Sequence, residues 1–141
     1  MSDVVFVDTN ILVYAHDADA GEKHQRAVEI LQGLWETDTG RLSVQVLQEF
    51  YINVTRKLTT RLARSTAREV IETYAAWIHE QTTADTVLRA TDIADLAQIS
   101  FWDALILASA EKSGAARLYS EDLNHGQSIV GIQIVNPLLP S

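Results

Sequence analysis

Short apolar runs alternate with amphipathic segments along this chain, a pattern typical of strands that alternate with helices. The first run, Val4–Val7, consists of β-branched and aromatic residues and predicts a buried strand. It ends abruptly in the polar residues Asp8, Thr9 and Asn10. Three later runs predict further strands: Leu42–Val44, Arg117–Ser120 and Ile132–Val135.

Helical periodicity fills the segments between these runs. Thr66-x-x-Glu69 and Ser100-x-x-Asp103 have the spacing of capping boxes that open helices, and Gly114 marks a helix end. Thr86–Leu88 is left open between a helix and a short edge strand. Strands separated by helices indicate an α/β fold with a mainly parallel sheet. We expect a single domain over residues 1–141 with a helical hairpin around 46–80. The helical segments are Ile11–Ala15, Glu22–Trp35, Val46–Val54, Thr66–Ile78, Val87–Ala97 and Ser100–Lys112.

Composition limits the class of protein. The chain has 141 residues, 47% of them hydrophobic, which suits one globular domain with a proper core. It has no apolar run of 18 residues and no basic-then-apolar leader, so we expect a cytoplasmic protein without a membrane span. The absence of cysteine excludes disulfides, thiolate metal sites and a cysteine nucleophile.

The charge is strongly negative overall but unevenly distributed. The net charge is −8, which by itself opposes binding to nucleic acid. Five of the 11 basic residues nevertheless fall within 13 positions: Arg56, Lys57, Arg61, Arg64 and Arg68. This segment suits a polyanion held at the edge of an acidic body, although a solvated helix end and turn is the more common explanation of such a segment taken alone.

Four carboxylates occupy positions that can converge. Asp8 and Asp122 follow predicted strands, whereas Glu49 and Asp103 are expected in the first turns of helices. Each has an ordinary interpretation, as a helix cap or as a partner of the helix dipole. If they share a pocket, each pair 4 Å apart is repelled by about 4 kcal/mol, so the cluster needs protons or a cation. Oxygen ligands without cysteine suit Mg²⁺ or Mn²⁺, which support phosphodiester hydrolysis.

In four segments, taken in order along nearly the whole length, the chain resembles the PIN-domain ribonucleases, specifically the VapC-type toxins of toxin–antitoxin pairs. Each motif is modest alone, but the four together are specific. They are Val7–Tyr14 (VDTNILVY), Ser43–Tyr51 (SVQVLQEFY), Phe101–Ile106 (FWDALI) and Tyr119–Gly126 (YSEDLNHG).

The resemblance implies a three-layer α/β/α sandwich and Mg²⁺-dependent endoribonuclease activity. The acidic positions of the family correspond to Asp8, Glu49, Asp103 and Asp122, with Asp8 and Asp103 as direct metal ligands and the other two completing the pocket. The small polar positions that flank the pocket correspond to Thr9, Asn10 and Ser120, which are expected to orient the carboxylates.

The resemblance also implies an RNA substrate, a cognate VapB-like antitoxin and a homodimer. Arg56, Lys57 and Arg61 are candidates for contact with the RNA backbone or the antitoxin. Two other functions stay open: a PIN nuclease of general RNA or DNA processing, and a non-catalytic binding module. A receiver-type signalling module is disfavoured, because Thr9-Asn10 and Asn136-Pro137 stand where it would carry paired acids and a lysine.

Overall fold

A five-stranded sheet with the order β2-β1-β3-β5-β4 forms the centre of the computed structural model, which describes residues 3–140. β2, β1, β3 and β5 run parallel, and only β4 is antiparallel to its neighbour. Val7 pairs with Tyr119, and Tyr119 pairs with Val135, so three carboxyl ends lie level at one edge of the sheet. The strands are β1 (Val5–Val7), β2 (Gly40–Arg41), β3 (Arg117–Tyr119), β4 (Ser128–Ile129) and β5 (Ile132–Val135).

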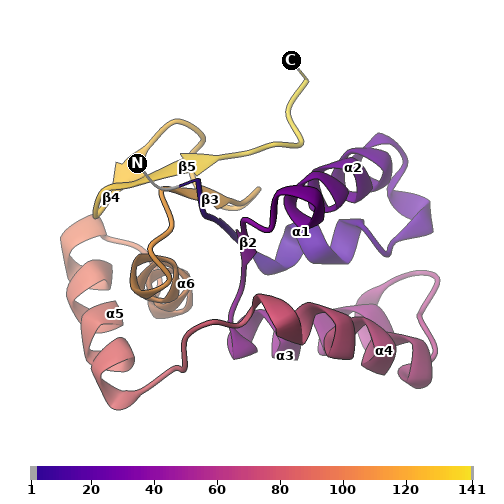
Figure 1. Cartoon of the computed structure of the whole chain (residues 1–141), viewed down its shortest axis with the longest axis horizontal. Helices are drawn as coiled ribbons and strands as arrows, with labels where there is room; N and C mark the ends of the chain where they lie inside the picture. The colour runs from indigo at the N-terminus through magenta and orange to yellow at the C-terminus, as the bar shows by residue number, and fades with distance from the viewer. Residues whose placement is uncertain (1–2, 141) are drawn as a thin grey trace.

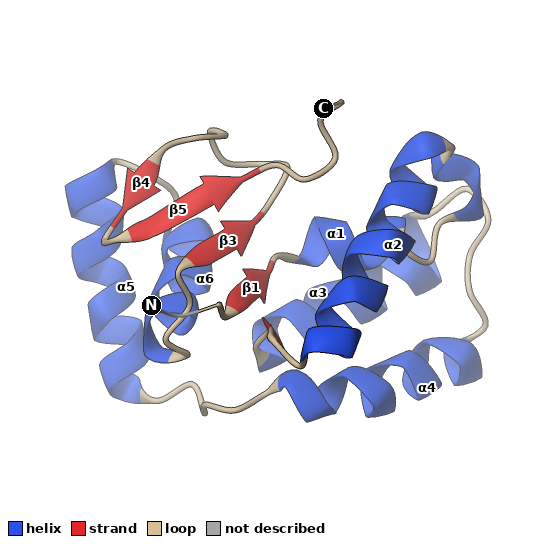
Figure 2. Ribbon diagram, turned by 45° about the horizontal axis from the view of Figure 1, so that its top comes forward, coloured by secondary structure: helices blue, strands red, loops and turns tan. Residues whose placement is uncertain are grey.

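Helices flank this sheet and give the predicted three-layer α/β/α arrangement (Figures 1 and 2). Figure 1 shows α5 and α6 packed together on one side, while α1 and α2 lie beyond β2, near α3 and α4. A π-helical turn, Asn53–Lys57, extends α3. The helices are α1 (Thr9–Tyr14), α2 (Glu22–Thr37), α3 (Val44–Ile52), α4 (Arg64–Tyr74), α5 (Ala84–Ala97) and α6 (Phe101–Lys112), with 3₁₀ turns at Ala18–Ala20 and Ala75–Trp77.

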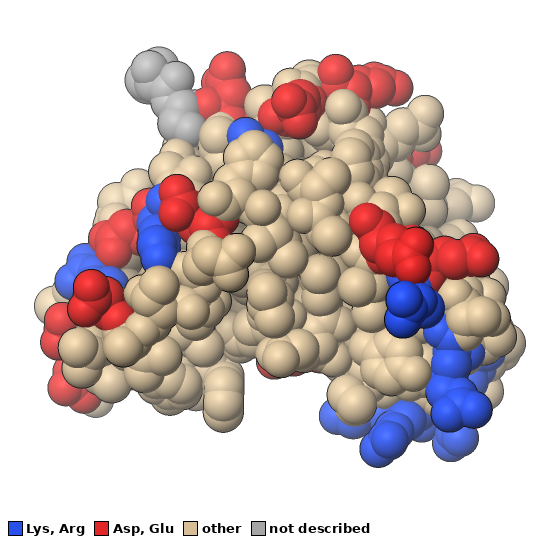
Figure 3. All heavy atoms as spheres, turned by 60° about the horizontal axis from the view of Figure 1, so that its bottom comes forward, with Lys and Arg blue, Asp and Glu red and all other residues tan. Residues whose placement is uncertain are grey.

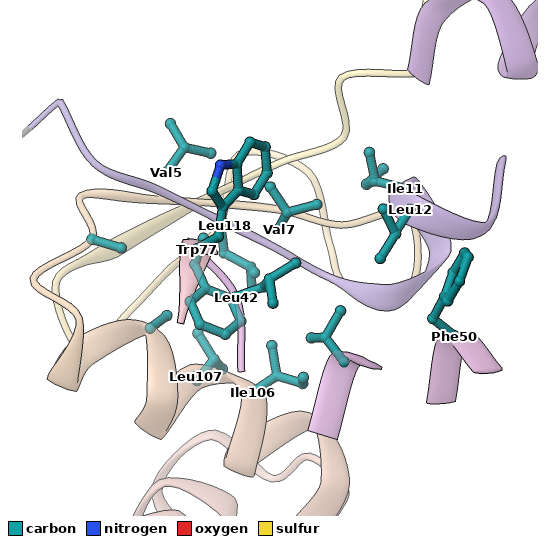
Figure 4. Packing of buried hydrophobic residues seen from close by; sticks show 14 of the residues in the cluster. Val5, Val7, Ile11, Leu12, Leu42, Phe50, Trp77, Ile106, Leu107 and Leu118 are labelled. Atoms are coloured by element: carbon teal, nitrogen blue, oxygen red, sulfur yellow. The ribbon is translucent and has the colours of Figure 1, made fainter. Parts of the chain in front are cut away.

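The core is one cluster that joins the central strands to helices on both sides. All three residues of β1 are buried, as the unbroken apolar run predicts for a central parallel strand. Figure 4 shows Val5 and Val7 among Leu42, Trp77, Leu107 and Leu118. Burying each such side chain contributes roughly 1.5–3 kcal/mol. β1 is therefore held firmly, and Asp8 directly follows it.

The prediction of a strand at Leu42–Val44 is wrong. The pairing residues are Gly40 and Arg41, and Val44 already begins α3. Leu42 instead donates its N–H to the carbonyl of Trp77 at 3.2 Å. The indole of Trp77 lies so close that a Cβ on Gly40 would stand 2.6 Å from it, so this edge strand depends on a packing contact that is remote in sequence.

Two helix starts also differ from the prediction. Because α3 begins at Val44, Glu49 lies in its second turn and not in the first turn, where a carboxylate best offsets the helix dipole. α4 begins at Arg64 with no side-chain cap, so Thr66 and Glu69 are interior positions and not a capping box. The segment left open at Thr86 is helical, because Thr83 and Thr86 cap α5 reciprocally.

The short strand β4 is absent from the sequence-based prediction. It forms a hairpin with β5 through Val130 and Gly131, both at positive φ (46° and 80°). Two-residue hairpins need this backbone, which glycine and asparagine adopt readily and valine does not. Of the two turn residues, Gly131 matches the usual sequence signal of such a hairpin and Val130 does not.

Over residues 3–140, no single helix has the length and apolar character to cross a membrane. The bent pair α5 and α6, which meet at 116°, satisfies both criteria only when the two helices are taken together.

Candidate active site

Asp8 lies where β1 gives way to α1, and the fold restrains both its backbone and its carboxylate. Its N–H donates to the carbonyl of Tyr119 at 2.9 Å, which continues the pairing between β1 and β3. Its Oδ1 accepts the N–H of Thr9 at 2.7 Å and so caps α1. Its Oδ2 accepts the hydroxyl of Ser120 at 2.8 Å. The cap and the pocket position, which the sequence left as alternatives, are properties of the same side chain.

This carboxylate is buried, with 5% of the residue exposed. Burial raises the pKa of Asp8 to about 6, because a carboxylate loses its hydration inside the protein. The hydrogen bonds from Ser120 and Thr9 partly oppose this rise, and the negative charges of Asp122 and Glu49 add to it. Asp8 is therefore a buried acid, and Asp122 and Glu49 lie near enough to raise its pKa further.

Ser120 connects Asp8 to the loop that follows β3. It is fully buried, donates its hydroxyl to Asp8, and accepts the N–H of Asp122 at 3.2 Å. Asp122 itself is exposed at the mouth of the pocket. One hydroxyl therefore orients the Asp8 carboxylate and positions the backbone of a second acid.

Thr9 and Asn10 reach two other parts of the pocket. The hydroxyl of Thr9 donates to Oε1 of Glu49 at 2.6 Å, which ties α1 to α3. Within residues 3–140, Asn10 makes no hydrogen bond to a carboxylate: its Oδ1 accepts the backbone N–H of Glu121 at 3.2 Å, and its buried Nδ2 has no hydrogen-bond partner. Thr9 and Ser120 thus each hold an acid, whereas Asn10 holds the loop after β3.

Asp103 stands in the first turn of α6. Ser100 caps this helix by accepting the N–H of Asp103 at 3.1 Å, as the capping pattern predicts. Unlike Asp8, Asp103 is partly exposed, and it faces the same pocket of about 410 Å³. The structure thus brings together all four acids singled out in the sequence, from the junction of β1 and α1, from α3, from α6 and from the loop after β3.

The pocket also contains groups that the sequence reasoning did not select. Two further acids line it, and the exposed indole of Trp102 forms part of its wall. Only contacts between remote segments identify these residues, since none has an unusual sequence spacing. The acids that line the pocket are Asp8, Asp17, Glu49, Asp103, Glu121 and Asp122.

Glu121 differs from the other acids because a cation already neutralises it. Lys23 lies 2.6 Å from its Oε2, and the hydroxyl of Tyr14 donates to its Oε1 at 2.6 Å. Burial acts to raise the pKa of Glu121, but the contacts with Lys23 and Tyr14 outweigh it and lower the pKa overall. Glu121 is therefore a partnered acid, whereas Asp8 has no ion pair within the described residues 3–140.

The donor set suits a hard divalent cation. Carboxylate oxygens gather here without sulfur ligands, which favours Mg²⁺ or Mn²⁺. Among residues 3–140, no three His, Asp or Glu side chains converge tightly enough to hold an ion by themselves. Mg²⁺ does not need such a cage, because it usually keeps several waters and takes one or two carboxylates from the protein. The residues therefore fit this ion.

The basic segment begins beside the pocket. Asn53 and Leu58, at the two ends of the π-helical turn, line the pocket, and Arg56 and Lys57 lie between them with exposed side chains. Figure 3 shows basic side chains gathered at one corner of the molecule, at the end where α4 lies, apart from most acidic ones on this face. π-helical turns occur frequently at functional sites.

Comparison with known proteins assigns this architecture to a family. The model of the PIN domain matches residues 5–127. No curated protein sequence matches the chain.

Solved structures share the fold at low sequence identity. VapC20 of Mycobacterium tuberculosis, described as a Sarcin-Ricin loop cleaving toxin, is 24% identical with a TM-score of 0.61 over 84% of this chain and 89% of its own. VapBC2 of Rickettsia felis, bound to a DNA fragment from its promoter, is 18% identical with a TM-score of 0.63 over 93% and 96%. FitAB bound to an IR36 DNA fragment is 19% identical with a TM-score of 0.69 over 98% of each chain.

Proposed function

Since this chain belongs to the PIN-domain family, we propose that it is a metal-dependent endoribonuclease and the VapC-type toxin of a type II toxin–antitoxin pair. One observation carries the proposal: Asp8, Glu49, Asp103 and Asp122 come from four separate elements and line one pocket. A fold has no structural reason to gather unpaired acids, because they repel one another. Gathered acids are what a cation-assisted reaction at a phosphodiester requires.

Asp8 and Asp103 are the proposed ligands of Mg²⁺, or of Mn²⁺ in its place. When bound, the ion would offset the charge of the phosphodiester and polarise it for attack by water. Asp8 suits this role because Thr9 and Ser120 hold its carboxylate in one orientation. Asp103 suits it because it lines the same pocket from the first turn of α6, which Ser100 caps.

Glu49 and Asp122 are the proposed acceptors of the proton from the attacking water. Thr9 engages Oε1 of Glu49, so the hydrogen bond fixes the direction of the carboxylate toward the pocket. Asp122 is exposed and lines the same pocket. As the water oxygen bonds to phosphorus, its proton passes to one of these carboxylates and the bond from phosphorus to the leaving oxygen breaks.

Arg56, Lys57 and Arg61 are the proposed contacts to the backbone of a single-stranded RNA. All three are exposed, and no ion pair is recorded for them within residues 3–140. The turn that carries Arg56 and Lys57 opens directly onto the acidic pocket. By holding phosphates at this edge of the pocket, these residues would let an acidic protein bind an RNA that carries the same sign of charge.

The proposed partner is a VapB-like antitoxin encoded beside this chain, and the proposed assembly is a homodimer in the cytoplasm. Two structural neighbours, VapBC2 and FitAB, are complexes. A basic side chain of an antitoxin would find six acids lining the pocket, of which Glu121 alone has an ion pair among the described residues.

Induced expression in a bacterial host tests this function. The wild-type chain should arrest growth, and co-expression of the neighbouring open reading frame should relieve the arrest. Asp8→Asn should abolish the arrest at equal protein level, whereas Asp95→Asn, an exposed acid on α5 outside the pocket, should not. Growth that is indifferent to the wild-type chain and to the neighbour would contradict the toxin assignment.

A further inference from the structure

Trp102 is the most unusual side chain in the wall of the acidic pocket. Trp77 is buried with 1% exposed, but Trp102 leaves 62% of its surface in solvent. It immediately precedes Asp103, and both residues line the pocket. A large aromatic side chain is thus exposed beside one of the proposed metal ligands.

The fold holds this residue in place although its indole is exposed. The carbonyl of Trp102 accepts a hydrogen bond of 3.3 Å from Nε2 of Gln45, a buried residue of α3. The ring of Phe101 meets the indole nearly perpendicularly, at 78° and with 5.1 Å between the ring centroids. Ser100 caps the helix from which both rings project. An anchored backbone with an exposed ring is a preorganised surface for a flat ligand.

We propose that Trp102 is a stacking platform for an unpaired nucleobase next to the scissile phosphate of the RNA. This inference rests on the proposed ribonuclease function and names the part of the substrate that this wall receives. Stacking does not depend on positive charge, and it accepts any base because every base has an aromatic face. The chain has a net charge of −8, and its 11 arginines and lysines alone do not offset this charge. Stacking on Trp102 therefore adds affinity for RNA at the place where acids surround the substrate.

A base is available for stacking only if it is not paired, so the platform selects single-stranded or looped RNA. The proposed occupant is a base and not the backbone, because an indole carries no positive charge to hold a phosphate and its flat face stacks on a base. The contribution of Trp102 should therefore be seen with a single strand and be lost with a duplex of the same sequence.

Binding of a labelled single-stranded RNA oligonucleotide tests the platform, with Asp8→Asn present in every chain to prevent cleavage. Trp102→Leu should weaken binding roughly ten- to a hundredfold, as loss of base stacking does elsewhere. Trp102→Phe keeps an aromatic face and should lose only a few-fold. Leu88→Ala, at a side chain with the same exposure (63%) on α5 outside the pocket, should bind unchanged.

The salt dependence separates stacking from charge. Trp102→Leu should leave the slope of log affinity against log salt unchanged, whereas Arg56→Gln should reduce it by about 0.7, the value for one phosphate contact on a single strand. The duplex oligonucleotide should bind equally to the chain that retains Trp102 and to the chain with Trp102→Leu.

Three results would overturn the platform. The first is unchanged binding of single-stranded RNA by Trp102→Leu while the wild-type chain still cleaves RNA. The second is equal weakening by the Leu and Phe substitutions. The third is weakening that accompanies a change from dimer to monomer in light scattering, which would assign the indole to a contact between copies. If the wild-type chain neither binds nor cleaves RNA, the proposed function fails and the platform fails with it.

Discussion

The hydroxyl of Thr9 donates to Oε1 of Glu49 at 2.6 Å and joins two residues that are 40 positions apart. Thr9 directly follows Asp8, whose carboxylate accepts its backbone N–H. A single residue therefore restrains two of the four acids, one through its amide and one through its hydroxyl. The geometry of the pocket depends on this link between α1 and α3.

Replacing Thr9 by valine should reduce activity more than stability. Thr9 is buried, with 8% of the residue exposed. Valine has nearly the same shape, so the substitution removes only the hydrogen bond to Glu49. Loss of such a supporting contact typically reduces activity 10- to 100-fold, while the free energy of unfolding should fall by only about 1 kcal/mol. Cleavage rates and urea denaturation measure the two effects. Thr9→Ser keeps the hydroxyl and should retain most activity; a Ser variant as slow as the Val variant would contradict this role.

The raised pKa of Asp8 predicts a specific dependence of stability on pH in the absence of divalent metal. The pKa of Asp8 in the folded protein is about 6, above the ordinary aspartate value of 3.8, so the folded protein holds this proton more tightly than the unfolded chain does. Stability from this group is complete below pH 4 and is lost as pH rises through about 6, by on the order of 3 kcal/mol.

Asp8→Asn cannot titrate and should lack this loss. The difference in unfolding free energy between the wild-type and Asp8→Asn proteins, measured in EDTA from pH 4 to pH 8, should therefore shift in favour of the variant. A difference that is constant over this range would show that the carboxylate is not destabilised by burial.

Divalent metal should reverse this penalty. Mg²⁺ or Mn²⁺ that binds only the folded chain stabilises it by an amount that grows with the ratio of metal concentration to Kd. We expect a rise in Tm on addition of metal to the wild-type protein, and a return to the starting value with EDTA. Asp8→Asn and Asp103→Asn should show little rise, and Asp95→Asn should respond like the wild type. An equal rise in all four proteins would place the metal elsewhere.

Two glycines should respond in opposite directions to the same substitution. A Cβ on Gly40 would stand 2.6 Å from the buried indole of Trp77, so Gly40→Ala should destabilise the fold by roughly 1–3 kcal/mol. Gly33 lies inside α2 with no atom within 4 Å of a Cβ, so Gly33→Ala should stabilise it by about 0.5–1 kcal/mol. Urea denaturation distinguishes the two. Equal effects would mean that the Trp77 contact does not constrain β2.

The parts of the fold that the sequence predicts are those with strong local periodicity. The run that forms β1 is apolar throughout, and the apolar spacing of α2 is helical over most of its length. The errors fall where remote contacts decide the structure. β2 pairs at Gly40 because Trp77 packs there. β4 forms because Val130 adopts a positive φ, which a valine in the sequence does not predict.

The site follows the same division. The sequence singles out Asp8 and Asp122 because each follows a predicted strand, and Glu49 and Asp103 because each is expected in the first turn of a helix. For Glu49 that expectation is wrong, since α3 begins at Val44. It misses the pairing of Lys23 with Glu121 and the exposure of Trp102, since both depend on how distant segments pack. Local chemistry is readable from spacing, but neutralisation and exposure are properties of the folded pocket.

The central claim, that the acids form one metal-dependent nuclease centre, is tested most directly by cleavage of a single-stranded RNA by purified protein. With Mg²⁺, the wild-type and Asp95→Asn chains should cleave at the same rate, and EDTA should stop both. Asp8→Asn should reduce the rate at least a hundredfold with its circular dichroism spectrum unchanged, because loss of a group that merely supports a metal ligand already costs about 10- to 100-fold and Asp8 is a proposed ligand itself. Cleavage by Asp8→Asn at the wild-type rate would contradict the account.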